Sequence, residues 1–177
     1  MARKILRVRD PNMLKSVGRV VYDPYRGDMK RRTKYWCVVD VDRELTRYLR
    51  SWVDRELINI TGIEGYGLSQ PSWDAHISII RGEGDVRNVP KDVLDELWGK
   101  YQNREVEFEY TLDVRQSGDK PVDGFDPKDH FWFVNVYSEE LTYIRKEMGL
   151  PYNWNLHLTF GRTYDERQGK FPIYVPR

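Results

Sequence analysis

The order of apolar and polar positions predicts alternating strands and helices from residue 34 onward. A β-branched and aromatic run at 35–41 is typical of a buried strand, and alternation over 105–114 is typical of a strand covered on one face. Another aromatic run, 131–136, predicts a further strand. Apolar residues at every third and fourth position predict three helices: one over about 42–57, one opened by Pro90, and one capped by Ser138 and ended by Gly149.

Two further strands carry one shared pattern, first over 71–81 and again over 151–162. Aligned on His76 and His157, both copies have Trp three positions before the histidine and Asp or Asn two before. Both have Ser or Thr two positions after it, an apolar residue three after and Arg five after. Two of the three histidines in the chain therefore share one motif. Chance agreement of the hydroxyl position alone is on the order of 1%.

Each copy of the motif follows a predicted helix. The order is strand, helix, motif strand, helix, strand, strand, helix, motif strand. This order predicts an α+β fold in which two similar lobes, built from mixed or antiparallel sheet with helices on the outer faces, surround a shared cleft. We expect one domain over 1–177, with an N-terminal arm at 1–33, a core at 34–164 and a C-terminal tail at 165–177.

Alternation of side chains gives each motif strand a chemical face and an apolar face. His76 and Ser78 share the chemical face of the first copy, and His157 and Thr159 share that of the second. The same alternation adds Asp74 and Asn155 to the chemical faces and turns four residues toward the core: Ile77, Ile79, Leu158 and Phe160.

These residue types in duplicate suit acid–base chemistry on a phosphodiester. Imidazole titrates near neutral pH, so one neutral histidine can accept a proton while a second, charged histidine donates one. The hydroxyls of Ser78 and Thr159 can donate hydrogen bonds to phosphate oxygens from two sides. We therefore expect His76, Ser78, His157 and Thr159 to be catalytic, with the choice of base and acid between the histidines left open.

The arginines five positions after each histidine have two interpretations. Strict alternation places Arg81 and Arg162 on the opposite face from the histidines, unless each strand ends or bulges before the arginine. Structural ion pairing and contact with a substrate phosphate are equally good alternatives, and the second makes both arginines substrate-binding candidates.

The chain is rich in Trp and Tyr, which can build a core or stack on bases. Alternation favours packing for Trp73 and Trp154, and Trp154 is also a candidate for substrate contact. The other aromatic candidates for base stacking are Tyr22, Tyr25, Trp36 and Tyr152.

Composition narrows the classes of partner. The 29 basic and 28 acidic residues nearly balance, which disfavours binding to duplex DNA through bulk charge. The chain has one cysteine and no signal-peptide core or membrane-spanning apolar run, which is typical of a cytoplasmic protein. Neither His-x-His nor His-Glu-x-x-His occurs, so we expect no metal and no cofactor. A monomer is expected.

The two motifs, His76-Ile-Ser78-Ile79-Ile-Arg81 and His157-Leu-Thr159-Phe160-Gly-Arg162, resemble those of the 2H phosphoesterase superfamily, which includes RNA-ligating and 2′,5′-phosphodiesterase proteins. The resemblance extends over roughly 35–164. It implies a bilobal fold of two pseudo-symmetric sheet lobes around a central groove, and metal-independent cleavage or formation of phosphodiester bonds in ribonucleotides.

Within that family the chain is similar to the enzymes with which phages degrade the cyclic oligonucleotide messengers of CBASS defence. The resemblance thus implies a small ribonucleotide or cyclic oligonucleotide substrate, in the host cytoplasm if the chain is phage-encoded. Two alternatives stay open: an enzyme that processes RNA ends or 2′,5′ linkages, for which a larger basic surface is expected, and a non-catalytic nucleotide-binding module. The intact histidines and hydroxyls argue against the second.

Overall fold

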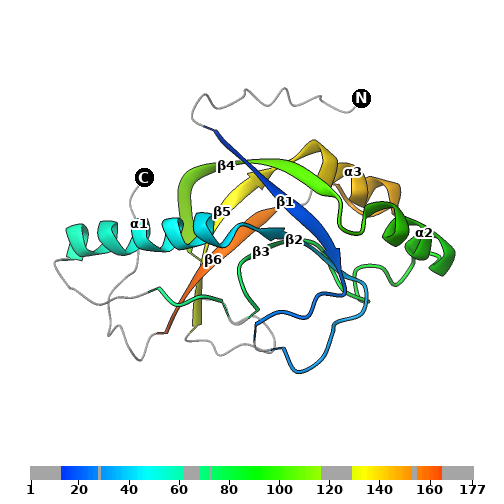
Figure 1. Cartoon of the computed structure of the whole chain (residues 1–177), viewed down its shortest axis with the longest axis horizontal. Coiled ribbons are helices and arrows are strands. Elements are labelled where there is room, and N and C mark those ends of the chain that lie inside the picture. Colours follow the sequence, from blue (N-terminus) through cyan, green and yellow to red (C-terminus); the bar gives the residue numbers. More distant parts are fainter. Residues whose placement is uncertain are drawn as a thin grey trace.

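The computed structural model describes residues 13–27, 29–61, 68–71, 73–116, 129–152 and 155–164. Within these residues, strands form a closed antiparallel barrel in the order β1-β2-β3-β6-β5-β4 (Figure 1). The elements in chain order are β1 Leu14–Tyr22, β2 Trp36–Val41, α1 Arg43–Thr61, β3 His76–Arg81, α2 Lys91–Tyr101, β4 Glu105–Gln116, β5 Asp129–Tyr137, α3 Glu139–Glu147 and β6 His157–Tyr164.

From β2 onward the predicted order of strands and helices is confirmed. Ser138 caps α3 as predicted, since its side chain accepts a hydrogen bond from the Leu141 amide. Pro90 precedes the first residue of α2, where a missing amide hydrogen is no loss.

The prediction of a bilobal fold with two separate sheets is wrong. The two motif strands, β3 and β6, pair directly with each other, and β1 pairs with both β2 and β4, so the strands close into one barrel. In the strand order 1-2-3-6-5-4 the motif strands β3 and β6 are neighbours, so the two copies of the motif lie side by side.

The first strand was not predicted, because the sequence pattern placed its residues in a polar arm. In β1, Val20 is fully buried, while Val17 and Leu14 are exposed. Its pairing with β4 runs from Leu14 opposite Tyr110 to Arg19 opposite Glu105. Only the C-terminal part of this strand is buried, and its pairing with β2 and β4 leaves no local pattern in the sequence that would predict it.

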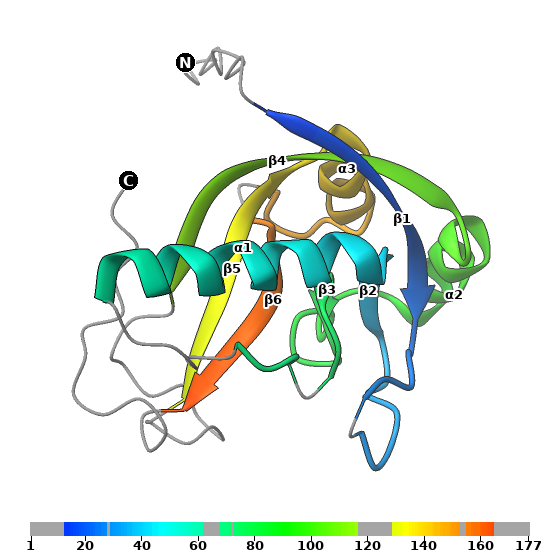
Figure 2. The same cartoon turned by 60° about the vertical axis from the view of Figure 1, so that its left-hand side comes forward.

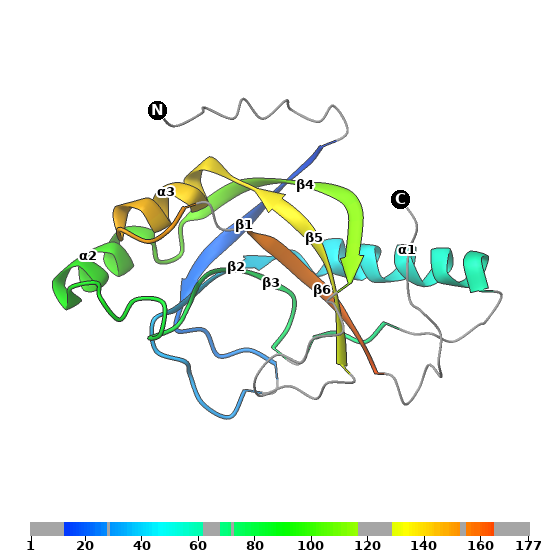
Figure 3. The ribbon, with the colours of Figure 1, turned by 180° about the vertical axis from the view of Figure 1, so that it is seen from behind.

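α1 lies toward one end of the molecule, and α2 and α3 lie toward the other (Figure 1). In Figure 2, α1 crosses in front of the strands, and in Figure 3 it lies on the opposite side of the molecule from α2 and α3. Their buried residues join those of the strands in one large core. The predicted apolar anchors of the motif strands belong to it, and all four are fully buried: Ile77, Ile79, Leu158 and Phe160.

Gly18 of β1 packs tightly against β2, and we expect Gly18→Ala to destabilise the protein. An added Cβ would collide with Cγ1 of Val39 and lie 2.7 Å from the Asp40 carbonyl oxygen, which belongs to the backbone and cannot rotate away. Overpacking of this kind costs about 1–3 kcal/mol. Urea unfolding measures the loss. Gly84→Ala is the matched control, because nothing lies within 4 Å of its added Cβ; equal effects of the two changes would contradict the packing argument.

Candidate active site

The two copies of the motif meet on adjacent strands. His76 of β3 lies opposite Thr159 of β6, and Ile77 lies opposite Leu158. Continuing this antiparallel register by one residue sets Ser78 opposite His157. Since residues directly opposite each other share a face, each histidine lies beside the hydroxyl of the other copy. We call the side of the sheet that carries His76, Ser78, His157 and Thr159 the histidine face.

Each motif strand contains a bulge three to four positions after its histidine. The register of β2 with β3 passes from Val38 opposite Ser78 to Cys37 opposite Ile80, so Ile79 is extra. In the same way, the register of β5 with β6 passes from Phe133 opposite Thr159 to Trp132 opposite Gly161. The extra residue in β6 is therefore Phe160.

The bulges return the arginines to the histidine face. Ile79 and Ile80 are both buried, as are Phe160 and Gly161, so each pair of neighbours faces the core. The next residue in each strand then turns to the other side. Arg81 lies opposite Trp36, and Arg162 lies opposite Phe131 with its guanidinium carbon 5.7 Å from the centre of that ring.

Two helix arginines hold the bulges at equivalent atoms. Arg145 of α3 donates to the Ile79 carbonyl at 2.7 Å, and Arg50 of α1 donates to the Phe160 carbonyl at 3.0 Å. Each carbonyl is three positions after its histidine. The helix that precedes one motif therefore supports the strand of the other motif, and these two contacts link the motifs.

Arg145 also ties the first motif to the approach of the second. Its side chain is 2% exposed, and its Nε donates to the Pro151 carbonyl at 2.8 Å. The Asp85 carboxylate lies 3.9 Å from Arg145 and accepts from the Arg81 amide at 2.9 Å. Desolvation lowers the pKa of Arg145, with Asp85 acting in the opposite direction. Sequence reasoning missed Arg50 and Arg145 because each looks like one charge on a helix surface.

Both histidines are oriented by the same contact. Nδ1 of His76 lies 2.8 Å from the Asp74 carbonyl, and Nδ1 of His157 lies 3.1 Å from the Asn155 carbonyl. A carbonyl can only accept, so Nδ1 carries the hydrogen in each ring. This leaves Nε2 of each histidine as the atom that can take up or release a proton.

The surroundings keep both histidines neutral at pH 7. Burial lowers the pKa of His76 to about 4, with the positive charges of Arg26 and of a protonated His157 acting in the same direction. Burial also lowers the pKa of His157, and the Arg81 charge adds to this effect. The hydrogen bonds to the carbonyls oppose both shifts. A bound phosphate anion would raise both pKa values toward the range in which one histidine is charged.

Aromatic side chains flank each histidine. The Trp36 ring is 5.0 Å from the His76 ring and nearly perpendicular to it, and Trp36 Nε1 donates to Ser78 Oγ at 3.4 Å. Trp73 packs edge-on against Trp36 at 5.6 Å. On the other side, the Phe133 ring is 5.2 Å from the His157 ring. Phe133 was not among the predicted site residues, although its strand was predicted.

The assignment of Trp73 to the core is wrong. Its side chain is 43% exposed, next to Trp36 at the histidine face. The alternation that predicted burial does not extend this far, because β3 begins at His76 and Asp74 adopts a left-handed conformation with φ of 57°. For the same reason Asp74 contributes its carbonyl to the site.

Arg26 anchors the loop before β2 to the approach of the first motif. It donates to the carbonyls of Trp73 and Ala75 at 3.2 and 2.9 Å and pairs with Asp40 at 2.8 Å. Asp40 lies directly opposite His76. Both charges belong to the environment of His76, and neither was predicted from the sequence.

The remaining predicted residues are scattered. Tyr22 is 3% exposed and stacks on Trp98 in the main core, apart from the histidines. Tyr25 and Tyr152 are 61% and 62% exposed, on the loops before β2 and β6. Trp154 lies outside the described residues.

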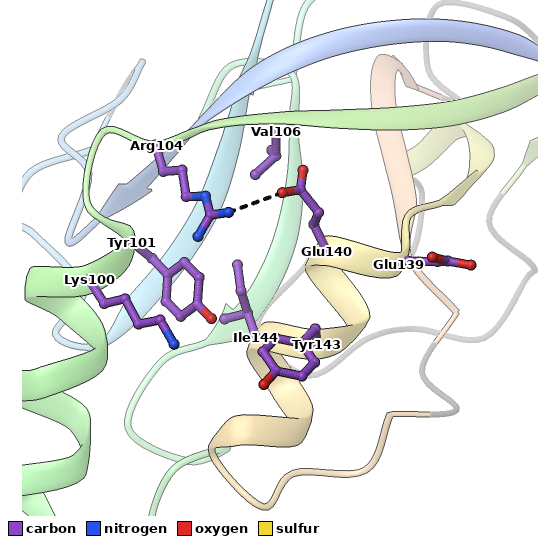
Figure 4. Close-up of a pocket in the computed structure, with 8 residues that line it drawn as sticks. All are labelled: Lys100, Tyr101, Arg104, Val106, Glu139, Glu140, Tyr143 and Ile144. Carbon is purple, nitrogen blue, oxygen red and sulfur yellow. Dashed lines mark hydrogen bonds and ion pairs between the residues drawn. The ribbon is translucent and has the colours of Figure 1, made fainter.

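A cavity of about 340 Å³ lies between α2 and α3 (Figure 4). Its lining includes an ion pair between Arg104 and Glu140 at 3.3 Å, and none of the histidine-face residues lines it. Over the described ranges, no three His, Cys, Asp or Glu side chains come together as a metal site, and no helix is long and apolar enough to span a membrane. No family model, curated protein or solved structure matches the chain.

Proposed function

We propose that the chain is a metal-independent phosphodiesterase of the two-histidine type that acts on small ribonucleotides, and specifically on cyclic oligonucleotide messengers. The observation that carries the proposal is the antiparallel pairing of the two motif strands. It sets His76 beside Thr159 and aligns Ser78 with His157, while both Nδ1 atoms are held by carbonyls. The resemblance of the motifs to the 2H phosphoesterases supports the same chemistry.

His76 suits the part of general base. Its pKa of about 4 leaves Nε2 unprotonated at neutral pH, so it can take a proton from a ribose 2′-hydroxyl or from water. The oxygen so activated attacks phosphorus, and the bond from phosphorus to the leaving oxygen breaks. That oxygen takes its proton from Nε2 of His157, which the substrate phosphate helps to keep charged.

The hydroxyls are placed to stabilise the phosphoryl oxygens. Ser78 Oγ accepts from Trp36 Nε1, so its own hydrogen is available for a non-bridging oxygen. Thr159 offers a second hydroxyl from the neighbouring strand, beside His76. Donors on both sides of the phosphate can compensate the charge that develops during displacement.

The experiment is a substrate panel in the presence of EDTA. It contains cyclic di- and trinucleotides, 2′,5′-oligoadenylates, 2′,3′-cyclic nucleotides and linear RNA. We expect turnover of a cyclic oligonucleotide that EDTA does not reduce and that His76→Ala with His157→Ala abolishes. Loss of turnover with EDTA, or turnover in the double variant, would overturn the two-histidine mechanism. Cleavage of linear RNA ends alone would favour the RNA-processing alternative.

A further inference from the structure

Arg81 and Arg162 occupy equivalent places at the two ends of the histidine face. Each comes three positions after the hydroxyl of its own motif, and the strands are antiparallel, so the arginines lie at opposite ends of the catalytic group. The order along the paired strands is Arg162, the Thr159 and His76 pair, the Ser78 and His157 pair, then Arg81. The row spans on the order of 20 Å of strand.

Arg81 and Arg162 face the same side as the histidines because of local features of the two motif strands. An unbroken strand would turn each arginine away from the histidines, and each motif strand instead has a bulge whose carbonyl is held by Arg50 or Arg145. Hydrogen bonds of backbone groups also fix the ends of the two strands. The Arg81 amide donates to Asp85, and Arg162 exchanges two backbone hydrogen bonds with Ser69, both at 2.9 Å.

The two arginines lie at the ends of the catalytic group and not at its centre. The Arg81 charge lowers the pKa of His157, which places the guanidinium in that neighbourhood. A phosphate between the two histidines, however, lies roughly 10 Å of strand from either arginine backbone. A substrate strand laid along the row would therefore bring its next phosphate on each side toward Arg81 at one end and Arg162 at the other. Guanidinium forks match phosphate oxygens in charge and geometry.

We propose that Arg81 and Arg162 bind the phosphates on either side of the scissile one. The substrate is then an oligonucleotide with at least three consecutive phosphates, which a dinucleotide or a cyclic mononucleotide does not supply. The inference rests on the proposed phosphodiesterase function and names the substrate class of that site.

The test compares kcat/KM for substrates with one and three phosphates, in the linkage that the panel identifies. Adenylyl dimer and tetramer serve for linear chains, and cyclic di- and trinucleotides extend the comparison. We expect a higher kcat/KM for three phosphates. Arg81→Gln and Arg162→Gln should each lower that advantage about 10-fold or more, mainly through KM. The matched control is Arg47→Gln, an exposed arginine of α1 paired with Glu44.

Salt dependence gives a second readout that a structural role would not move. For the three-phosphate substrate, each arginine removed should reduce the slope of log kcat/KM against log salt by about 0.7. Histidine-dependent turnover with no preference for three phosphates would overturn this inference alone. So would arginine variants that lower kcat/KM equally for long and short substrates, since the arginines would then bind the scissile phosphate. Turnover that ignores the histidines would overturn the proposed function as well.

Discussion

His76→Ala and His157→Ala should each lower kcat by about 10²- to 10⁴-fold on the substrate that the panel identifies. That is the usual contribution of one positioned proton carrier. The double variant should be scarcely worse than either single variant, because the base and the acid act on one displacement and their losses are not additive. Single-turnover rates at saturating enzyme measure the chemical step directly.

His76→Asn separates proton transfer from structure. The asparagine amide can still donate to the Asp74 carbonyl, which accepts from Nδ1 in the native chain at 2.8 Å, but it offers no group that can take up a proton. We expect this variant to be as slow as His76→Ala while unfolding at a similar urea concentration. Near-native turnover of His76→Asn would show that the imidazole serves only to position its neighbours.

The sequence predicted the parts of the site that follow from alternation within one strand. His76 and Ser78 on one side and fully buried Ile77 and Ile79 on the other are consequences of the strand period, which is local. The adjacency of the two motifs was implied only by their duplication. It depends on pairing between residues about 80 positions apart, such as His76 and Thr159.

The arginines mark where local reasoning stopped. Strict alternation puts Arg81 and Arg162 on the far face, and the alternative of a bulge in each strand stayed open because bulges have no fixed sequence signature. A bulge forms where a partner strand and an outside donor accommodate an extra residue, and here the donors come from α1 and α3. Barrel closure was missed for a related reason. It depends on the pairing of β1 with β2 and β4, and no local pattern within β1 predicts these partners.

The profile of kcat/KM against pH should be bell-shaped, with its maximum below pH 6.5. The free enzyme needs one neutral and one charged histidine, and both pKa values lie below the ordinary 6.5, that of His76 at about 4. Above the upper pKa the acid loses its proton, so kcat/KM should fall tenfold for each pH unit. Below pH 4 the base is protonated and the rate should fall again. An optimum above pH 7 would contradict the lowering of both histidine pKa values by burial.

Arg81→Gln identifies which limb of this profile belongs to His157. The Arg81 charge disfavours the protonated ring and lowers the pKa of His157, so removing it must raise that pKa. If His157 is the acid, more of it stays charged at higher pH, and the alkaline limb moves upward. If His157 is the base, it becomes protonated earlier as the pH falls, and the acidic limb moves upward instead. Because the two limbs are macroscopic properties of the coupled pair, the wild-type profile alone cannot assign them, whereas the direction of this shift can.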